Sequence, residues 1–295
     1  MRCNSQSFQA TAAKTSSMSS TGSHTKFTYT KQITCKNKSV AIEPTSLLSN
    51  PEINIEIEEY NESMRQKIVN TLSTYGIVLG HVNHDDPEGK IFKQLIEEIG
   101  EIDTHDEKGT KTWDVKYDPS VDQAKGTRSL TLREFEMHTD ASFELPPPKY
   151  ICLYVVREDA FGGGISQIIE GRKLLALLSA ETKHILQSKY TVRVPDEFYK
   201  GRRYEQVPIL DEEMNFSFRR DIIIREECSA AQLQALEELE ALLSNESIIE
   251  SKFLPRGTML ILDNGRFLHA RTEVKDKDRH LLRMRFQPNT KIFGI

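Results

Sequence analysis

The segment "LPRGTMLILDNGRFLHARTEV" spans residues 254–274 and contains an unbroken apolar run, MLIL. Such a run, followed at once by turn residues, is typical of a strand that is buried on both faces. The turn residues here are an Asp-Asn-Gly triplet, and His269 follows them. The segment therefore predicts a buried strand that ends in a turn, with an imidazole just beyond it. We assign Asp263 and Asn264 to the turn rather than to metal binding.

Similar short apolar runs recur along the chain, separated by turns and helical stretches. Strands are expected at residues 77–82, 129–140, 150–158, 164–171, 190–195, 206–212, 215–224, 257–264 and 280–288. Helices are expected at residues 61–76, 89–101, 171–188 and 229–249, and a long loop at residues 106–127. Many short strands with helices outside them predict a mainly β protein with a double-stranded β-helix core, the jelly roll of cupin-like barrels. Because no repeat or linker divides residues 43–295, we expect a single domain there.

A second segment, "EFEMHTDASF" at residues 134–143, carries His138 and Asp140 two positions apart. Two strand residues at this spacing point to the same face, about 6–7 Å apart. An imidazole beside a carboxylate makes two-thirds of a 2-His-1-carboxylate iron site. In a barrel, His269 can lie beside this strand and supply the second imidazole. Three coordination positions of Fe(II) would then stay open for a bidentate 2-oxo acid and O2.

The stretch "DRHLLRMRF" predicts a strand with one cationic face, because Arg279, Arg283 and Arg285 alternate with apolar residues. Cations on a core strand need anionic partners, since burying an unpaired charge is costly. A 2-oxo acid with a second carboxylate suits arginine, whose planar guanidinium pairs with a carboxylate through two parallel hydrogen bonds. We therefore expect an anion pocket next to the metal.

Together with "FGGGISQ", these segments resemble the iron(II)/2-oxoglutarate dioxygenases of the taurine dioxygenase (TauD/TfdA) and clavaminate synthase type. The resemblance covers residues 65–290. It rests on "MHTDASF", "FGGGISQ", "LDNGRFLHART" and "DRHLLRM", which occur in the family's order. One His-x-Asp motif is weak evidence, whereas four motifs in this order are specific.

The resemblance implies a role for each matched residue. The iron ligands would be His138, Asp140 and His269. Ser166, after the glycine turn, and Arg279 would bind the far carboxylate of 2-oxoglutarate, and Arg283 would contact the substrate or support the co-substrate. The segment between His269 and Arg279 is short, so Arg279 and Arg283 can exchange roles. Asp140 disfavours halogenation, because the halogenases of the family lack this carboxylate.

The implied reaction is the oxidation of an unactivated C–H bond. In the family, 2-oxoglutarate chelates Fe(II) and is decarboxylated with O2 to succinate, and the substrate loses a hydrogen. The product is hydroxylated, desaturated or ring-closed, for example by the kainoid-synthase type of cyclisation of an N-prenylated glutamate. Two other functions stay open: a non-catalytic metal-binding jelly-roll protein, and a cupin-type dioxygenase that needs no 2-oxoglutarate.

The arginines exceed what the co-substrate needs, so we expect a small anionic metabolite as substrate, such as an amino acid or amino-diacid derivative. Candidate contacts on expected strands are Arg283, Arg285, Arg219 and Arg220. Because Arg219 and Arg220 are adjacent on a strand, only one of them can face the pocket. The alternative for both is a surface ion pair.

Two further segments offer candidates for the substrate site. Tyr199, Lys200 and Arg203 lie in a segment that either covers the pocket mouth or forms a solvated charge cluster. Trp113, in the expected loop before the metal strand, either lines the pocket or anchors the packing.

The polar segment "GHVNHDDPEG" superficially resembles a metal cluster, since it contains two histidines and two aspartates. It follows an expected strand, so we interpret it as a solvated turn. His105, in "IDTHDEKG", is interpreted in the same way.

The amino-acid composition limits the kinds of partner that the protein can bind. A net charge of −5 and a pI near 6.0 argue against nucleic acid. No apolar run approaches the roughly 18–20 residues that cross a bilayer, so no membrane partner is expected. The four cysteines form no C-x-x-C pair, which argues against structural zinc and favours reduced thiols inside the cell. The oligomeric state, homo-oligomer included, stays open.

Residues 1–42 differ from the rest of the chain. They contain six basic residues and no acidic one, so the remaining residues carry a net charge of −11. A basic, Ser/Thr-rich and acid-free stretch is typical of organelle transit peptides, and equally of a disordered tail without an address. We expect a cytoplasmic protein, or a plastid or mitochondrial one if the tail is a transit peptide, and exclude the tail from the fold.

Overall fold

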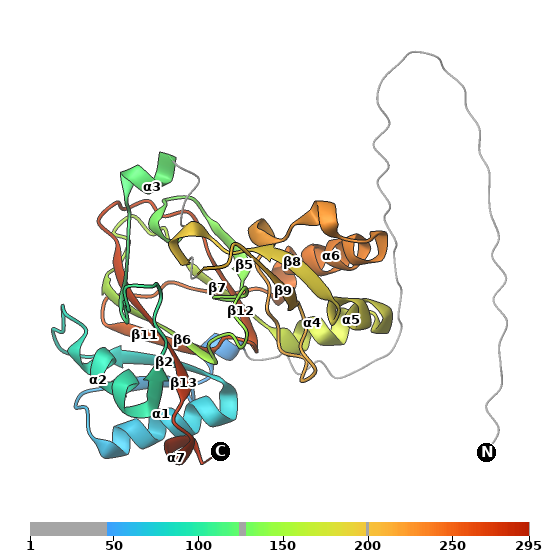
Figure 1. Ribbon diagram of the computed structural model, residues 1–295. Helices are drawn as coiled ribbons and strands as arrows, with labels where there is room; N and C mark the ends of the chain where they lie inside the picture. The colour runs from blue at the N-terminus through green and yellow to red at the C-terminus, as the bar shows by residue number, and fades with distance from the viewer. Residues whose placement is uncertain (1–45, 124–127, 199–200, 295) are drawn as a thin grey trace, which may run out of the picture. The chain divides into compact units, whose positions relative to one another are not determined.

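The computed structural model describes residues 46–123, 128–198 and 201–294 (Figure 1). The tail at residues 1–42 lies outside them. The helices are α1 Glu62–Tyr75, α2 Lys90–Ile99, α3 Pro119–Gln123, α4 Gly171–Leu177, α5 Ala180–Leu186, α6 Ala230–Leu243 and α7 Thr290–Phe293. The strands are β1 Asn54–Ile57, β2 Ile77–Val82, β3 Gly100–Ile102, β4 Trp113–Lys116, β5 Phe135–His138, β6 Tyr150–Arg157, β7 Ser166–Glu170, β8 Lys189–Arg193, β9 Tyr204–Pro208, β10 Glu250–Lys252, β11 Thr258–Asp263, β12 Phe267–Arg271 and β13 His280–Pro288.

The strands form two main sheets and a two-stranded ribbon. The first sheet has seven strands, in the order β1-β2-β11-β6-β13-β3, with β4 also paired to β13. The second has four strands, in the order β10-β7-β12-β5, and the ribbon is β8-β9. The pairs are antiparallel, apart from the parallel pair of β1 and β2. Strands distant in sequence thus become neighbours, as a jelly roll requires.

Alternate strand residues point into the space between the two main sheets. Ile151 of β6, Leu260 of β11 and Leu281 of β13 come from the seven-stranded sheet. They share one apolar cluster with Ile168 of β7 and Phe267 of β12, which come from the four-stranded sheet. The two sheets therefore pack face to face, and this arrangement is the predicted double-sheet jelly roll.

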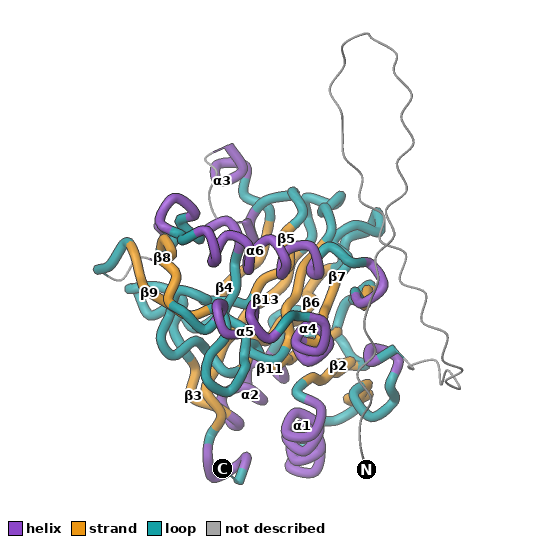
Figure 2. The backbone as a smooth tube through the Cα atoms, turned by 90° about the vertical axis from the view of Figure 1, so that its right-hand side faces the viewer, coloured by secondary structure: helices purple, strands orange, loops and turns teal. Residues whose placement is uncertain are grey.

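The outer faces of both sheets are covered by helices (Figures 1 and 2). On the seven-stranded sheet, α1 and α2 pack against outward residues, and Phe92 stacks on Tyr154 with ring centroids 5.6 Å apart. On the four-stranded sheet, α4, α5 and α6 cover the outer face, and Leu239 of α6 joins the cluster that contains Leu268. Helical layers thus leave the inner faces free to form the site.

Strand β13 shows the expected alternation. Leu282, Met284 and Phe286 belong to the helix-facing cluster. Leu281 and Arg283 line the interior instead. The prediction of a core strand with one apolar and one cationic face is confirmed.

The strand expected at residues 129–140 is mostly wrong. Only Phe135–His138 pairs with β12, and residues 128–130 form a 3-10 turn. Asp140 lies in the turn after β5, where Ala141 has a φ of 51°. The ladder ends because Thr139 bonds to Phe218 instead of to β12. The two ligands are therefore brought together by a strand end and a turn, not by one strand face.

Three further expectations need correction. The loop at residues 106–127 contains β4 and α3, because the buried Val115 pairs with Leu281 of β13. The helix at residues 171–188 is two helices, since Ser179 caps α5 by accepting the N–H of Thr182. Residues 215–224 form isolated bridges and a 3-10 turn in place of a strand. Among the described residues, no helix has the length and apolar character to cross a membrane.

Candidate active site

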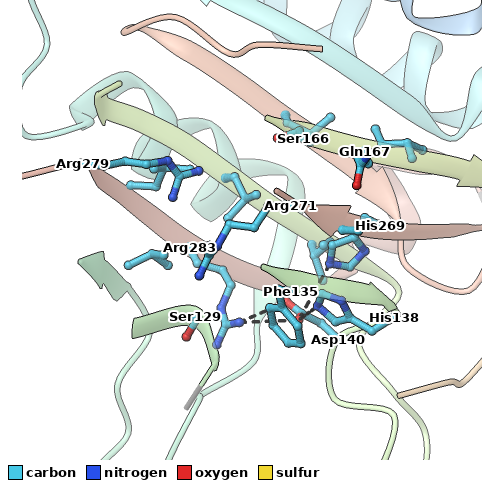
Figure 3. Close-up of a pocket in the computed structure, with 17 residues that line it drawn as sticks. Ser129, Phe135, His138, Asp140, Ser166, Gln167, His269, Arg271, Arg279 and Arg283 are labelled. Atoms are coloured by element: carbon cyan, nitrogen blue, oxygen red, sulfur yellow. Dashed lines mark hydrogen bonds and ion pairs between the residues drawn. The ribbon is translucent and has the colours of Figure 1, made fainter. Parts of the chain in front are cut away.

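Three side chains converge on the inner face of the four-stranded sheet (Figure 3). His138 ends β5, and the register of the sheet places it directly opposite His269 of β12. Asp140 Oδ1 lies 3.6 Å from His138 Nε2 and 3.9 Å from His269 Nε2. One donor atom of each residue lies within 4.8 Å of the others. Strand register therefore assembles the three predicted ligands.

Both imidazoles are prepared to donate a lone pair. His138 Nδ1 lies 2.7 Å from the carbonyl oxygen of Glu136, which can only accept, so Nδ1 carries a proton and Nε2 is the nitrogen that can bind a metal. Phe135 stacks on the His138 ring, with centroids 3.7 Å apart. Burial, reinforced by the neighbouring His138, lowers the pKa of His269 to about 3, so its imidazole is neutral at pH 7. Metal ligation requires this neutral form.

Two side chains hold the backbone of the His-x-Asp segment. Thr139 is fully buried, donates its N–H to the Phe218 carbonyl at 2.7 Å, and accepts the Phe218 N–H on Oγ1 at 2.9 Å. Asn264, in the turn after β11, accepts the Asp140 N–H at 2.8 Å and donates to the Asp140 carbonyl at 2.9 Å. The small residue between the ligands thus anchors the segment. Asn264, expected only to shape a turn, also positions Asp140.

The Asp140 carboxylate is charged although it is buried. Burial alone would raise its pKa, but the positive charge of the Arg283 guanidinium, 3.5 Å from both carboxylate oxygens, lowers it. The pKa of Asp140 is therefore held well below its usual value. One anionic oxygen and two neutral imidazole nitrogens are the donor set of the 2-His-1-carboxylate iron site, so the residues present fit Fe(II).

The three donors open into a cavity between the two sheets (Figure 3). Its apolar wall comes from both sheets and includes Val115, Ile151, Leu153, Ile168, Leu260 and Leu281. Its polar lining includes the predicted co-substrate residues Ser166, Arg279 and Arg283. The structure thus brings the three candidate metal donors and these residues to one cavity.

Arg279 is buried at this cavity. Burial lowers the pKa of its guanidinium to about 10, which Asp159 partly opposes. Within the described parts of the chain, no carboxylate forms an ion pair with Arg279. A buried cation that no carboxylate contacts directly is costly, and the far carboxylate of 2-oxoglutarate would pair with it. The residues present therefore fit this co-substrate.

The glycine turn before Ser166 makes room for Arg279. Gly164 has a φ of 60°, and a Cβ at this position would lie 2.7 Å from Arg279 Nε. The backbone therefore passes directly against the guanidinium, which only glycine allows. This contact explains why the triple glycine and Arg279 occur together.

A second buried guanidinium, that of Arg271, was not predicted. It lies on β12 two residues after His269 and lines the same cavity. It donates to four main-chain carbonyls, those of Arg128, Thr131, Arg133 and Thr272, at 2.6–3.3 Å. Arg271 therefore ties the segment that leads into β5 to the strand that carries His269.

Asp140 and Arg283 also line a second cavity, next to the first. Its other charged residues are Arg128, Arg219 and Arg285. Arg285 is 3% exposed and pairs with Glu144 at 3.0 Å. An anion pocket beside the metal was expected from the sequence, but the contribution of Arg128 was missed, because its turn carries no motif.

His105 lines this second cavity, so its interpretation as a solvated turn is wrong. It is 1% exposed, and its pKa falls to about 3 because of burial and the nearby cations Arg283 and Arg285. Its Nε2 lies 3.3 Å from the Arg283 carbonyl, while its Nδ1 has no hydrogen-bond partner among the residues that the structure describes. Asp86 is also buried, because it accepts the first N–H groups of α2.

The remaining predicted contacts divide into inner and outer residues. Arg219 lines the second cavity and pairs with Asp221, while Arg220 points outward and pairs with Glu136 and Glu240. Only one of the two faces inward, although the expected strand is absent. Trp113 lies on β4 and not in a loop, and its ring lies 6.0 Å from the Arg283 guanidinium.

Arg203 is 70% exposed and pairs with Asp196, away from both cavities. Tyr199 and Lys200 lie outside the described residues.

The chain was compared with known protein families. Residues 42–285 match the family described as "Taurine catabolism dioxygenase TauD, TfdA family". The chain belongs to this family. It is therefore an iron- and 2-oxoglutarate-dependent dioxygenase, and the resemblance, enzyme class and cofactors predicted from the sequence are confirmed. The alternatives of a non-catalytic protein and of a dioxygenase without 2-oxoglutarate are not supported.

Solved structures of similar fold agree with the jelly roll. An asparagine oxygenase in complex with Fe(II), 2S,3S-3-hydroxyasparagine and succinate is 19% identical and superposes with a TM-score of 0.65. The match covers 77% of this chain and 80% of that one. The non-heme iron oxygenase OrfP in complex with Fe and alpha-ketoglutaric acid is 16% identical, with a TM-score of 0.60 over 78% of this chain and 82% of that one. These likenesses confirm the fold class.

Proposed function

We propose that this dioxygenase oxidises a C–H bond of a small anionic metabolite of the amino-acid type. One observation carries the proposal. The triad and the buried Arg279 guanidinium line one cavity, and Asp140 and Arg283 connect it to a second, arginine-lined cavity. On the basis of their lining residues, we assign the metal and co-substrate to the first cavity and the substrate to the second.

In this proposal, His138, Asp140 and His269 hold the iron, and Arg279 with Ser166 holds the far carboxylate of 2-oxoglutarate. When bound, iron and 2-oxoglutarate together activate O2 and supply the oxidising power for removing a substrate hydrogen. The chain itself contributes orientation and a water-excluding wall of aliphatic side chains. Asn264 and Thr139 keep Asp140 and His138 in place during turnover.

Arg283 would bind the substrate carboxylate. With iron bound, Asp140 would share its charge with the metal, so the adjacent Arg283 could take a further anion beside Asp140. His105 Nε2 faces a carbonyl and must carry the proton, which leaves Nδ1 as an acceptor for a substrate N–H. A ligand with a carboxylate at Arg283 and an amine at His105 has the two groups of an amino acid. In the similar structures, the asparagine oxygenase holds hydroxyasparagine and OrfP holds (3S)-hydroxy-L-Arg.

The test begins with the apo-protein under anaerobic conditions. Adding Fe(II) and then 2-oxoglutarate should produce the weak visible charge-transfer band of the chelate. A panel of L-amino acids, N-substituted amino acids and neutral apolar compounds is then added with O2, and succinate formation is measured. Stimulation by amino acids supports the proposal. Stimulation by the neutral apolar compounds alone contradicts it.

The mass of the product decides the type of oxidation. Hydroxylation adds one oxygen atom to the substrate, whereas desaturation or kainoid-type ring closure removes two hydrogen atoms. The sequence allows both outcomes, and both use the same residues.

A further inference from the structure

The four arginines of the second cavity form two pairs with different neighbours. Arg283 and Arg285 come from β13, and the Arg283 guanidinium lies 5.9 Å from the ring of Phe198. Arg128 and Arg219 come from the turn before β5 and from the segment before the 3-10 turn at residues 220–222. These two also line a small pocket beside Phe135. The cavity therefore has two cationic ends.

The two ends differ in their acidic partners. Arg283 faces Asp140, and Arg285 pairs with Glu144 at 3.0 Å. At the other end, Arg219 binds both oxygens of Asp221 at 2.8 and 2.9 Å. Arg128 also acts on Asp221, so two cations share one carboxylate there. The second end thus has one positive charge in excess before any ligand binds.

The sum of the charges that line both cavities is also positive. Among the described residues, six arginines line them: Arg128, Arg219, Arg271, Arg279, Arg283 and Arg285. Four carboxylates act on these arginines: Asp140, Asp159, Asp221 and Glu144. Two positive charges remain; Fe(II) adds two and the 2-oxoglutarate dianion removes two. Two uncompensated positive charges in partly buried surroundings favour a ligand with matching negative charge.

We infer that the substrate carries two anionic groups, one bound at Arg283 and Arg285 and the other at Arg128 and Arg219. The inference rests on the proposed function and narrows its substrate class from a monoanion to a dianion. The second group can be a carboxylate, sulfonate or phosphate, since each pairs with guanidinium in the same way. An amino diacid, free or N-substituted, has the required carboxylates and an N–H for His105.

Acid and amide pairs test the inference, because the two members differ in charge and hardly in shape. L-glutamate is compared with L-glutamine, L-aspartate with L-asparagine, and N-alkyl-L-glutamate with N-alkyl-L-glutamine. Binding is followed anaerobically through the shift of the charge-transfer band of the enzyme loaded with Fe(II) and 2-oxoglutarate. For at least one pair we expect the acid to bind about 30–100-fold more tightly than the amide, the ratio for one charge-assisted bidentate contact. Equal binding within every pair, or tighter binding of the amides, overturns the inference.

Variants locate the second anion. Arg128→Gln should reduce the acid-to-amide ratio at least about tenfold, and Arg128→Lys should restore part of it. Neither change removes the Arg128 carbonyl that Arg271 uses. Arg220→Gln is the matched control, since this neighbour of Arg219 is 52% exposed and pairs on the outer surface. The inference is also overturned if Arg128→Gln and Arg219→Gln both keep the acid-to-amide binding ratio of the wild type. The circular dichroism spectra and thermal unfolding of both variants must be native for this result to count.

Failure of the proposed function looks different. In that case no amino acid stimulates succinate formation in air, whatever its charge. In the failure of this inference, amino acids stimulate turnover, but acids have no advantage over their amides.

Discussion

The two sheets that enclose the site contribute different chemistry. The four-stranded sheet supplies the two histidines of the proposed metal triad, and the turn after its strand β5 supplies Asp140. Each of the three is held by hydrogen bonds or packing before any ligand arrives. The seven-stranded sheet supplies Arg283 from β13, and Arg279 directly precedes this strand. Both are buried cations at the cavity; Arg283 pairs with Asp140, whereas no carboxylate of the described residues forms an ion pair with Arg279. The metal half of the site is therefore preorganised, whereas the anion half is completed by its ligands. This difference predicts where each substitution will act.

The largest effect is expected from breaking the metal half. Asp140→Ala removes the only anionic donor of the triad, and His269→Ala removes the second imidazole. We expect succinate formation to fall by more than about 100-fold, above the 10–100-fold typical of groups that only orient metal ligands. Iron content after reconstitution should fall in parallel, while Arg220→Gln should retain both. Near-normal turnover in either triad variant would refute the assignment.

The next effect separates two buried arginines of the same cavity. Arg279→Gln should raise the KM for 2-oxoglutarate about 30–100-fold, because a charge-assisted contact of about 2–3 kcal/mol is lost. Iron binding should not change. Steady-state kinetics and iron titration together check this.

Arg271→Gln should behave differently, since its guanidinium is satisfied by four carbonyls of the chain itself. We expect a lower free energy of unfolding, by about 2 kcal/mol or more, and a smaller change in KM than for Arg279→Gln. Urea denaturation measures the first quantity. If Arg271→Gln raises the KM more than Arg279→Gln does, the two arginines have exchanged roles.

A smaller effect is expected at the turn that holds Asp140. Asn264→Ala removes both hydrogen bonds to the Asp140 backbone without touching a metal donor. We expect a 10–100-fold loss of iron affinity, measured by competition with a chelator. Asn264→Asp keeps the hydrogen-bond acceptor but not the donor, so its iron affinity should lie between those of the wild type and Asn264→Ala. An iron affinity equal to that of the wild type in Asn264→Ala would show that the turn alone sets the position of Asp140.

The smallest effect at neutral pH is expected for His105. Its pKa is about 3 in the folded chain and about 6.5 when unfolded, so the unfolded state binds the proton first as the pH falls. The stability it contributes is present above pH 6.5 and is lost toward pH 3, by about 1.4 kcal/mol per pH unit. Between pH 7 and 5, the apo wild type should lose about 2 kcal/mol more than His105→Asn. Parallel loss in both proteins, measured by urea unfolding, would contradict this.

Much of the site could be predicted from the sequence, because the signals are local. The alternation of arginine with leucine, methionine and phenylalanine along β13 needs only the period of a strand. His138 and Asp140 are separated by one residue, so they stay close in a turn as in a strand. The triple glycine and Arg279 are recognisable as family motifs, and the structure adds the reason, which is the contact at Gly164.

Other residues could not be assigned in this way. Asn264 and Asp140 are 124 positions apart, and Arg271 and Arg128 are 143 positions apart, so neither contact has a local signal. His105 lies in a polar segment with the composition of a solvated loop. Only the packing of that segment against β13 removes it from water and lowers its pKa.

The sequence by itself thus predicted the jelly-roll class, the candidates for the three metal donors and the cationic face of β13, since periodicity and motif spacing act over a few residues. The tertiary structure alone decided which polar side chains lose their water, because desolvation depends on neighbours from distant parts of the chain. That second kind of information identified the roles of Asn264, Arg271, His105 and Arg128.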